Sequence, residues 1–154
     1  MRWFVLLMMC AGAYAQTPAP FIPDYVVGTG VSYDYYGKTG FAANTEIGIH
    51  VKGGTFSYTT LEMTATTATL RTGAAIIAKQ VGYWALIGLA DAGLATGSGS
   101  TVGSFSGGAL ISYDVGARVT KGVQHFYINV GARVLALTGT NVNPIFEITF
   151  MKGF

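Results

Sequence analysis

Along most of this chain, apolar side chains alternate with small or polar ones, and this alternation restricts the possible folds more than any other feature. From Tyr25 onward the segments repeat with a period of two and are separated by clusters of Gly, Thr, Asn, Ser and Lys. This is the period of a β-strand, whose successive side chains point to opposite faces. The sequence therefore predicts an all-β domain over residues 25–154, with about eight strands.

The apolar residues decide which face of each expected strand is apolar. The assignment is clear in the segments 25–35, 41–51, 108–119, 125–134 and 145–154. For segment 82–89 we expect Trp84 on the polar face and the following residues on the apolar face: Tyr83, Ala85, Ile87 and Leu89.

The segment 55–66 fits the alternation poorly. Phe56 and Tyr58 have one parity, whereas Leu61 and Met63 have the other. We therefore expect a β-bulge or a change of register there, and Glu62 is not assigned to a face.

Because the phases rest on apolar residues alone, the charged residues provide an independent test of them. Lys152 falls on an apolar face, and the others fall on the opposite one: Asp34, Glu46, Arg71, Lys79, Asp114, Arg118, Arg133 and Glu147. These charged side chains are therefore expected to face a common interior. The polar network predicted in this lumen comprises Asp34, Glu46, Arg71, Asp114, Arg118, His125, Arg133 and Glu147.

This polarity is the reverse of that in a soluble barrel or sandwich, where charges face water and apolar side chains fill the core. Charged residues are 10% of the chain and hydrophobic residues 51%, whereas ordinary soluble domains are about 25% charged. An apolar outer band around a polar lumen is typical of a transmembrane β-barrel, and lipid requires such a barrel to be closed. The prediction is an eight-stranded antiparallel up-and-down transmembrane β-barrel.

An even number of strands places both chain ends on one side of the barrel. The links 52–54, 79–81 and 120–122 are expected to be tight periplasmic turns, and 91–104 the longest loop, facing outside the cell. Outward aromatic residues are expected in two girdles, an upper one with Tyr33, Tyr35, Phe41 and Phe146 and a lower one with Tyr83, Phe126, Phe150 and Phe154.

Residues 1–15 have the pattern of a secretory signal peptide. Arg2 precedes an apolar stretch over 3–10, and Ala13-Tyr14-Ala15 has the small-x-small pattern of a cleavage site. The chain is therefore expected to be exported, with a Pro-rich leader over 16–24. Its one cysteine, Cys10, lies in the segment that would be removed, so no disulfide is expected. A lipoprotein anchor at Cys10 is the alternative, although Met9 is larger than that processing usually accepts.

The chain from Tyr25 to Phe154 resembles the small outer-membrane β-barrel proteins of Gram-negative bacteria, the OmpA-barrel-like and opacity-protein-like group. The resemblance rests on the cleavable leader, the segment "VVGTGVSYDYY", the segment "YWALIGLADAGLAT" and the terminal aromatic residue. It implies a location in the bacterial outer membrane, contact with outer-membrane lipid, and recognition of Phe154 by the barrel-assembly machinery. Lys152 stands where that group commonly has an aromatic or apolar residue.

Strand pairing predicts contacts in the lumen. A turn centred near Thr140 would place Arg133 opposite Glu147, and the preceding turn would place Arg118 opposite His125 and Asp114 opposite Asn129. Buried charges need such partners, so a structural role is the first interpretation and a gated ion path is the alternative. An eight-stranded barrel is only wide enough for side chains, which argues against a wide pore.

Catalysis is not expected. A lipid A deacylase would need a serine near a histidine, and the segment His125-Phe126-Tyr127-Ile128-Asn129 lacks the serine of the His-x-Ser-Asn pattern of those enzymes. His50 and His125 have no neighbouring acidic cluster in the sequence, so no metal site or cofactor is expected.

Three function classes follow from these patterns. The first is an outer-membrane barrel with a side-chain-filled polar lumen and a structural or surface-interaction role, whose extracellular partner is unknown. The second is a small lipid-modifying enzyme or narrow channel, and the third a soluble periplasmic barrel that binds an apolar ligand. The net charge of +2 and the scattered basic residues provide no footprint for nucleic acid.

Overall fold

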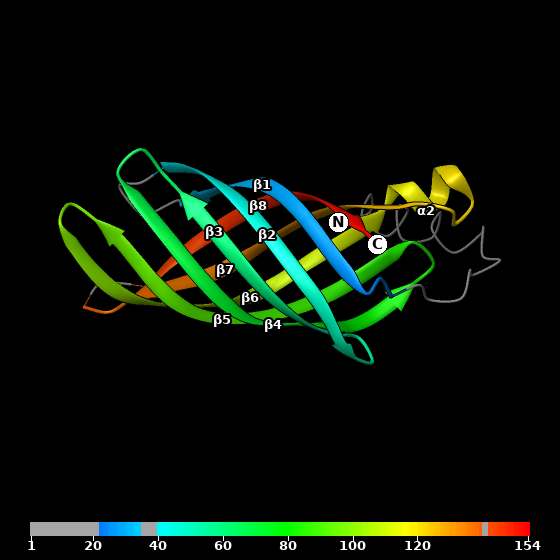
Figure 1. Cartoon of the computed structure of the whole chain (residues 1–154), viewed down its shortest axis with the longest axis horizontal. Coiled ribbons are helices and arrows are strands. Elements are labelled where there is room, and N and C mark those ends of the chain that lie inside the picture. The colour runs from blue at the N-terminus through cyan, green and yellow to red at the C-terminus, as the bar shows by residue number, and fades with distance from the viewer. Residues whose placement is uncertain (1–21, 35–39, 140–141) are drawn as a thin grey trace, which may run out of the picture.

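Eight antiparallel strands form a closed barrel in up-and-down order (Figure 1). The structure is a computed structural model that describes residues 22–34, 40–139 and 142–154, without the side chain of Asp34. The expected signal peptide and most of the expected leader lie outside the described residues. The strands are β1 (Tyr25–Asp34), β2 (Gly40–Lys52), β3 (Thr55–Met63), β4 (Thr67–Val81), β5 (Trp84–Gly97), β6 (Ser100–Asp114), β7 (His125–Leu137) and β8 (Val142–Gly153).

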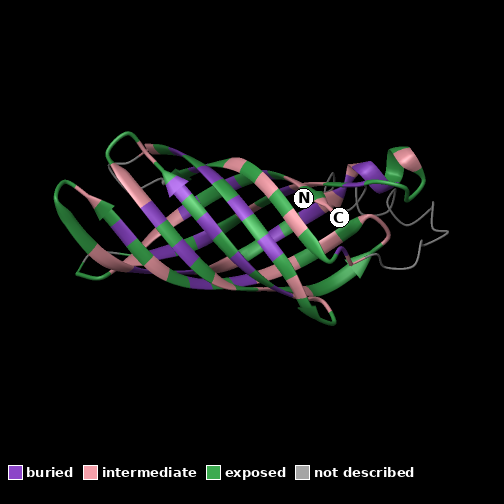
Figure 2. Cartoon of the chain, in the orientation of Figure 1, coloured by how far each residue is buried: buried purple, intermediate pink, exposed green. Residues whose placement is uncertain are grey.

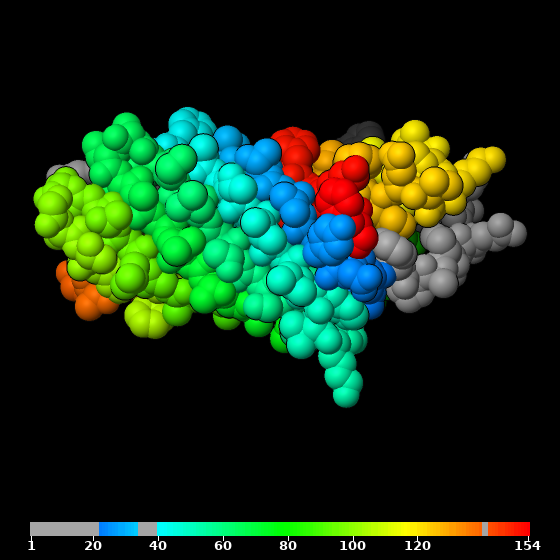
Figure 3. Space-filling view, viewed as in Figure 1, coloured from blue at the N-terminus to red at the C-terminus, as the bar shows by residue number. Residues whose placement is uncertain are grey.

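The first and last strands close the barrel. β1 pairs with β8 in a register that runs from Val26 opposite Gly153 to Asp34 opposite Ile145. At the same end, the Asp24 amide donates to the Phe154 carbonyl at 2.9 Å, and the Phe154 amide donates to Tyr25 O at 3.0 Å. The C-terminal segment therefore lies directly beside β1 (Figure 3), and the cylinder has no open edge. We call the end where β1 begins and β8 finishes the terminal end.

Burial alternates along the strands (Figure 2), and most of the buried side chains are polar or charged. Arg71, Arg133 and Glu147 are at most 2% exposed, whereas Ile111, Val130 and Ile148 are 53%, 49% and 42% exposed. The inverted arrangement expected from the sequence is confirmed, including the outward position of Lys152. Of the described residues, none belongs to a helix that is both long enough and apolar enough to cross a membrane.

The expected phase of the fifth strand is wrong. Trp84 and Leu86 point outward from β5, while Ala85, Ile87 and Leu89 point inward. The reason is that β5 continues past residue 89, and Asp91, which has the inward parity, is buried. A buried carboxylate with ionic partners fixes the face of its strand more firmly than one indole does.

The irregularities also lie elsewhere than expected. β3 is regular along β4 and buries Phe56, Tyr58, Thr60 and Glu62, so the expected bulge within it is wrong. The register shifts instead between His50 and Lys52 and between Ile77 and Lys79. The second shift inserts an extra residue before Lys79. This residue is therefore exposed rather than internal.

A short helix replaces the expected end of the sixth strand. The helix α2 (Val115–Thr120) begins directly after Asp114, whose Oδ1 accepts a hydrogen bond from the Ala117 amide at 2.8 Å. It ends at Lys121 in the left-handed conformation, with φ +54°. This capped turn ends the period of two at residue 114, although Val115, Ala117 and Val119 continue it in the sequence.

The connections differ in length from those expected. Residues 91–97 and 100–104 belong to β5 and β6, which are joined by a two-residue turn at Ser98 and Gly99, so the long loop over 91–104 is wrong. The tight turn expected at 79–81 lies at Gly82 and Tyr83 instead. At the terminal end, the connection 115–124 contains α2 and is longer than the turns at 53–54 and 82–83. The lengths of the connections therefore do not show which end of the barrel faces outside the cell.

Candidate functional site

The Arg133 side chain, from β7, is the centre of an ionic network inside the barrel. Its Nε donates to Glu147 Oε2 at 2.7 Å, and its Nη2 contacts the same oxygen. Nη1 donates to Asp91 Oδ2 at 3.2 Å, and Nη2 also donates to Glu46 Oε1 at 3.3 Å. One guanidinium group thus joins strands β2, β5, β7 and β8 across the lumen, as its planar array of donors allows.

Asp91 connects this arginine to a second one. Arg71 Nε lies 3.2 Å from Asp91 Oδ1, and Arg71 Nη2 donates to Glu62 Oε2 at 3.3 Å. The Tyr58 hydroxyl and the Ser106 hydroxyl each donate to Asp91 at 2.6 Å. We call Glu46, Glu62, Arg71, Asp91, Arg133 and Glu147 the ionic network.

The ionic network contains four carboxylates and two guanidinium groups, a formal excess of two negative charges. Hydroxyl groups supply further partners, since Ser32 Oγ donates to Glu62 at 3.0 Å and Thr60 Oγ1 donates to Glu46 at 3.4 Å. These buried, mutually bonded side chains connect the strands of the barrel wall at their level.

Glycines on the inner wall allow the neighbouring strand to lie close beside these side chains. Gly73 pairs with Asp91, and Gly108 pairs with Arg133. A Cβ atom at Gly108 would lie 2.3 Å from the Ala132 carbonyl oxygen and 2.5 Å from Arg133 Cα. At Gly73 it would lie 2.0 Å from the Ala90 carbonyl oxygen. The glycine-rich polar faces therefore have a packing reason.

The other described residues that were predicted for the interior lie at the terminal end of the barrel or outside its lumen. His125 Nδ1 and Asp114 Oδ2 are 2.5 Å apart and both side chains are buried. The expected pairs of Asp114 with Asn129 and of Arg118 with His125 are wrong, because Asp114 lies opposite Tyr127 and residue 118 lies in α2. Arg118 is exposed and donates to the Tyr113 hydroxyl at 2.5 Å.

Of the eight residues predicted for the lumen, the structure brings Glu46, Arg71, Arg133 and Glu147 together. Asp114 and His125 form a separate pair, Arg118 is excluded, and the side chain of Asp34 lies outside the described residues. Two members of the ionic network were not predicted, Glu62 and Asp91, and neither was the Tyr58 hydroxyl that donates to Asp91. Extending segment 82–89 by two residues would have placed Asp91 on the face assigned as apolar, and this conflict would have shown that the phase was wrong.

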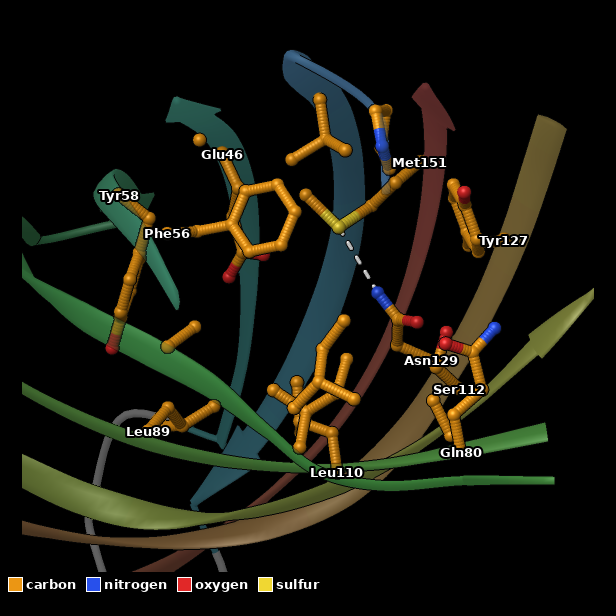
Figure 4. Close-up of a pocket in the computed structure, with 17 residues that line it drawn as sticks. Glu46, Phe56, Tyr58, Gln80, Leu89, Leu110, Ser112, Tyr127, Asn129 and Met151 are labelled. Carbon is orange, nitrogen blue, oxygen red and sulfur yellow. Dashed lines mark hydrogen bonds between the residues drawn. The ribbon is translucent and has the colours of Figure 1, made fainter. Parts of the chain in front are cut away.

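Between the ionic network and the terminal end, the side chains that face the interior are mostly apolar. A cavity of about 100 Å³ lies there, lined mostly by apolar side chains from several strands, including Phe56, Ile77, Ile87, Leu89, Leu110 and Met151. Glu46 and Tyr58 line it on the network side, and Pro23 and Gln80 line it at the terminal end. We call this cavity the chamber (Figure 4).

The described residues contain no group of three or more His, Cys, Asp or Glu side chains placed to hold a metal ion. The absence of catalytic residues, metal and cofactor expected from the sequence stays a prediction.

Comparison with known proteins supports the architecture. No family model matches the chain, and no curated protein matches it. A solved structure described as "De novo design of transmembrane beta-barrels" is similar to it, with a TM-score of 0.53 and 14% sequence identity. The similarity covers 86% of this chain and 99% of that one. The chain therefore has a transmembrane-barrel-like fold.

Proposed function

We propose that this chain is a bacterial outer-membrane β-barrel with a structural or surface-interaction role, built like the small Gram-negative barrels that its sequence resembles. One observation supports this most directly: exposed aliphatic side chains surround the barrel while its ionised groups are buried inside. In water that arrangement would be unfavourable, because a large apolar surface would remain hydrated. In a bilayer the same surface would contact acyl chains.

The outward aromatic residues form pairs near both ends of the barrel, which supports a membrane environment. Toward the end opposite the termini, the rings of Tyr33 and Phe41 lie 4.9 Å apart. At the terminal end, Tyr25 stacks on Phe154 at 5.0 Å. Trp84 and Tyr113 form a further pair there, 4.3 Å apart. Aromatic rings at two levels, with aliphatic residues between them, match the two interfaces of a bilayer.

The structure does not confirm two of the residues expected in the aromatic girdles. Tyr35 lies outside the described residues, and Tyr83 lies in a turn, so that the neighbouring Trp84 takes the outward position. Lys152 Nζ lies 5.6 Å from the Phe126 ring centre and 4.6 Å from that of Phe154. A cationic tip over aromatic rings at the end of a strand is compatible with an interfacial lysine.

The position of Phe154 fits the proposed assembly signal. Its ring is 45% exposed on the outside of the closing strand pair, where a partner could reach it. Recognition of this residue by the barrel-assembly machinery, and outer-membrane lipid as the surrounding partner, belong to the same proposal. We propose no catalytic activity and no nucleic-acid partner, and the extracellular partner stays unknown.

A pair of matched substitutions tests the membrane proposal. Val130 is exposed in the middle of β7, whereas Val123 is exposed in the connection beyond the barrel wall. In phospholipid vesicles, Val130→Arg should lower the free energy of unfolding by about 2–4 kcal/mol, as arginine does near a bilayer midplane. Val123→Arg should leave it unchanged. Equal stability of the two variants, with the chain recovered in the soluble periplasmic fraction, would favour a soluble barrel instead.

Electrical recording tests the proposed filled lumen. Because Arg133 and Arg71 are buried among carboxylates at the level of the ionic network, we expect no large, stable currents through planar bilayers that contain the full chain. Such currents would support the alternative of a channel. The measurement is independent of the stability test, since a conducting barrel would still be sensitive to Val130→Arg.

A further inference from the structure

The chamber is lined mostly by apolar side chains, and three of its polar ones lie together on one side, which we call the polar wall. Strands β3 to β5 contribute Phe56, Ala75, Ile77, Ile87 and Leu89 to the apolar wall. Strands β6 and β7 contribute Ser112, Asn129 and Tyr127 to the opposite wall (Figure 4). A molecule that fills the chamber would therefore need an apolar body and at least one polar group.

The polar wall contains buried groups that have no hydrogen-bond partner within the described residues. Asn129 is 3% exposed, and its amide nitrogen donates to Thr149 Oγ1 at 3.1 Å and lies 3.0 Å from Met151 Sδ. Its Oδ1 accepts no hydrogen bond from any described residue, and the buried Tyr127 hydroxyl is also unpartnered there. Buried acceptors without donors are unfavourable, so Asn129 Oδ1 indicates a ligand that donates.

The formal charges of the ionic network favour a cationic ligand. Glu46 belongs both to the chamber lining and to the ionic network, whose four carboxylates exceed its two guanidinium groups. Where the dielectric constant is low, an excess of negative charge attracts a cation strongly and repels an anion. An ammonium group would offset this excess and donate hydrogen bonds to the unpartnered acceptor.

We propose that the chamber binds a small organic cation, a primary amine on a short alkyl chain. Its alkyl body would lie against the apolar wall and its ammonium group would face Glu46 and Asn129. The size agrees with this class. A cavity of about 150 Å³ lined by Leu, Ile and Phe accommodates benzene, so a chamber of about 100 Å³ limits the ligand to a small molecule of a few non-hydrogen atoms.

The chamber reaches the terminal end of the barrel within the described residues. Gln80 lines it and is exposed, next to the tight turn at Gly82 and Tyr83. Entry from this side would not require the ionic network to open.

Three probes of similar size separate charge from shape. At pH 7, n-butylamine is a cation, 1-butanol is neutral and butyrate is an anion. Methyl-labelled methionine makes binding visible by NMR with the full chain in detergent. Met151 lines the chamber, whereas Met63 is exposed on the outside and reports partition of the probe into the detergent. We expect n-butylamine to shift Met151 in a saturable way at a concentration at least about tenfold below that needed for 1-butanol.

Matched variants locate the binding. Ala75 lines the chamber and Ala74, next to it in β4, points outward. Ala75→Leu should fill the chamber and weaken n-butylamine binding at least about tenfold, whereas Ala74→Leu should not change it. Asn129→Leu replaces the amide by an apolar side chain of the same branching and provides a second test if Ala75→Leu does not fold.

Several results would overturn the proposal. Equal binding of the three probes, or a Met63 shift as large as that of Met151, would show partition into detergent rather than a site. Equal binding of n-butylamine and 1-butanol at Met151 would show that the chamber does not select a cation. Unchanged binding in both Ala75→Leu and Asn129→Leu would place the probe elsewhere. None of these results bears on whether the barrel spans a membrane.

Discussion

The two halves of the barrel interior are filled by different means. In one half, six charged side chains occupy the lumen and Arg133 alone contacts three carboxylates. In the half near the terminal end, apolar side chains such as Phe56, Ile87 and Leu110 line the wall, and a cavity of about 100 Å³ is left. The same eight-stranded cylinder therefore contains the ionic network in one half and the chamber in the other.

Side-chain length explains this difference. An arginine reaches across the lumen and meets partners from three other strands, so one residue fills space and joins the walls. Tyr58, Leu89 and Leu110 form a small apolar cluster near the boundary between the two halves. Below it, shorter residues such as Ala75 and Ala85 line the wall. Where such short residues lie among larger ones such as Phe56 and Ile87, the side chains do not fill the cylinder, and a void results.

The largest effect is expected from the network half. Arg133→Met should lower the free energy of unfolding by about 3–5 kcal/mol, because it leaves Glu46, Asp91 and Glu147 without their shared partner. Denaturant unfolding in lipid vesicles would measure the loss. Arg118→Met is the control, since Arg118 is exposed on α2, and it should have no measurable effect. Similar stability of the two variants would contradict a structural role of the ionic network.

The chamber half should respond less strongly. Leu110 is 6% exposed and packs in the apolar cluster with Tyr58 and Leu89. Leu110→Ala should cost about 2–3 kcal/mol, near the lower limit for such truncations, because the side chain already borders a cavity. The same unfolding measurement applies, with Leu86→Ala on the outer face of β5 as the control for lost volume. A cost larger than that of Arg133→Met would reverse the order of the two halves.

The packing around Gly108, beside the ionic network, is tighter than the packing around its neighbour Gly107. Gly108→Ala should destabilise the barrel by about 1–3 kcal/mol, since the added Cβ would meet the backbone beside Arg133. Gly107→Ala is a close control, because the nearest atom to a Cβ there is the Leu89 carbonyl oxygen at 3.6 Å. Thermal unfolding of both variants in the same detergent would compare them. Equal losses would show that the wall is not tight beside Arg133.

The sequence alone predicted much of the barrel, because the period of two and the positions of the charged residues indicate the same inward face for most strands. The contact between Arg133 and Glu147 was also predicted and is confirmed, although the register is shifted by two residues. Arg133 lies opposite Ile145, and Gly131 lies opposite Glu147. The long side chains bridge this diagonal, which makes the contact tolerant of an error in the turn.

The errors have specific physical causes. An alternating pattern does not show where a bulge inserts an extra residue, so Lys79 was placed on the wrong face. Some predicted strands were also too short. The predicted segment that stopped at residue 89 did not include Asp91, the carboxylate that contacts both buried arginines. The chamber could not be predicted, because its volume depends on which side chains from six or more strands lie at the same height.

The smallest effect is expected at the terminal end, where Asp114 caps α2 through the Ala117 amide and contacts His125 at 2.5 Å. Asp114→Ala removes both interactions and should cost about 1 kcal/mol, the usual value for a lost N-cap. Asp114→Asn keeps an oxygen that can accept from the Ala117 amide but loses the charge beside His125, so its cost should be smaller. Hydrogen exchange at the Ala117 amide separates the two contributions. It should be faster in Asp114→Ala and nearly unchanged in Asp114→Asn. Faster exchange in both variants would mean that the contact with His125, rather than the cap, holds this connection against the barrel.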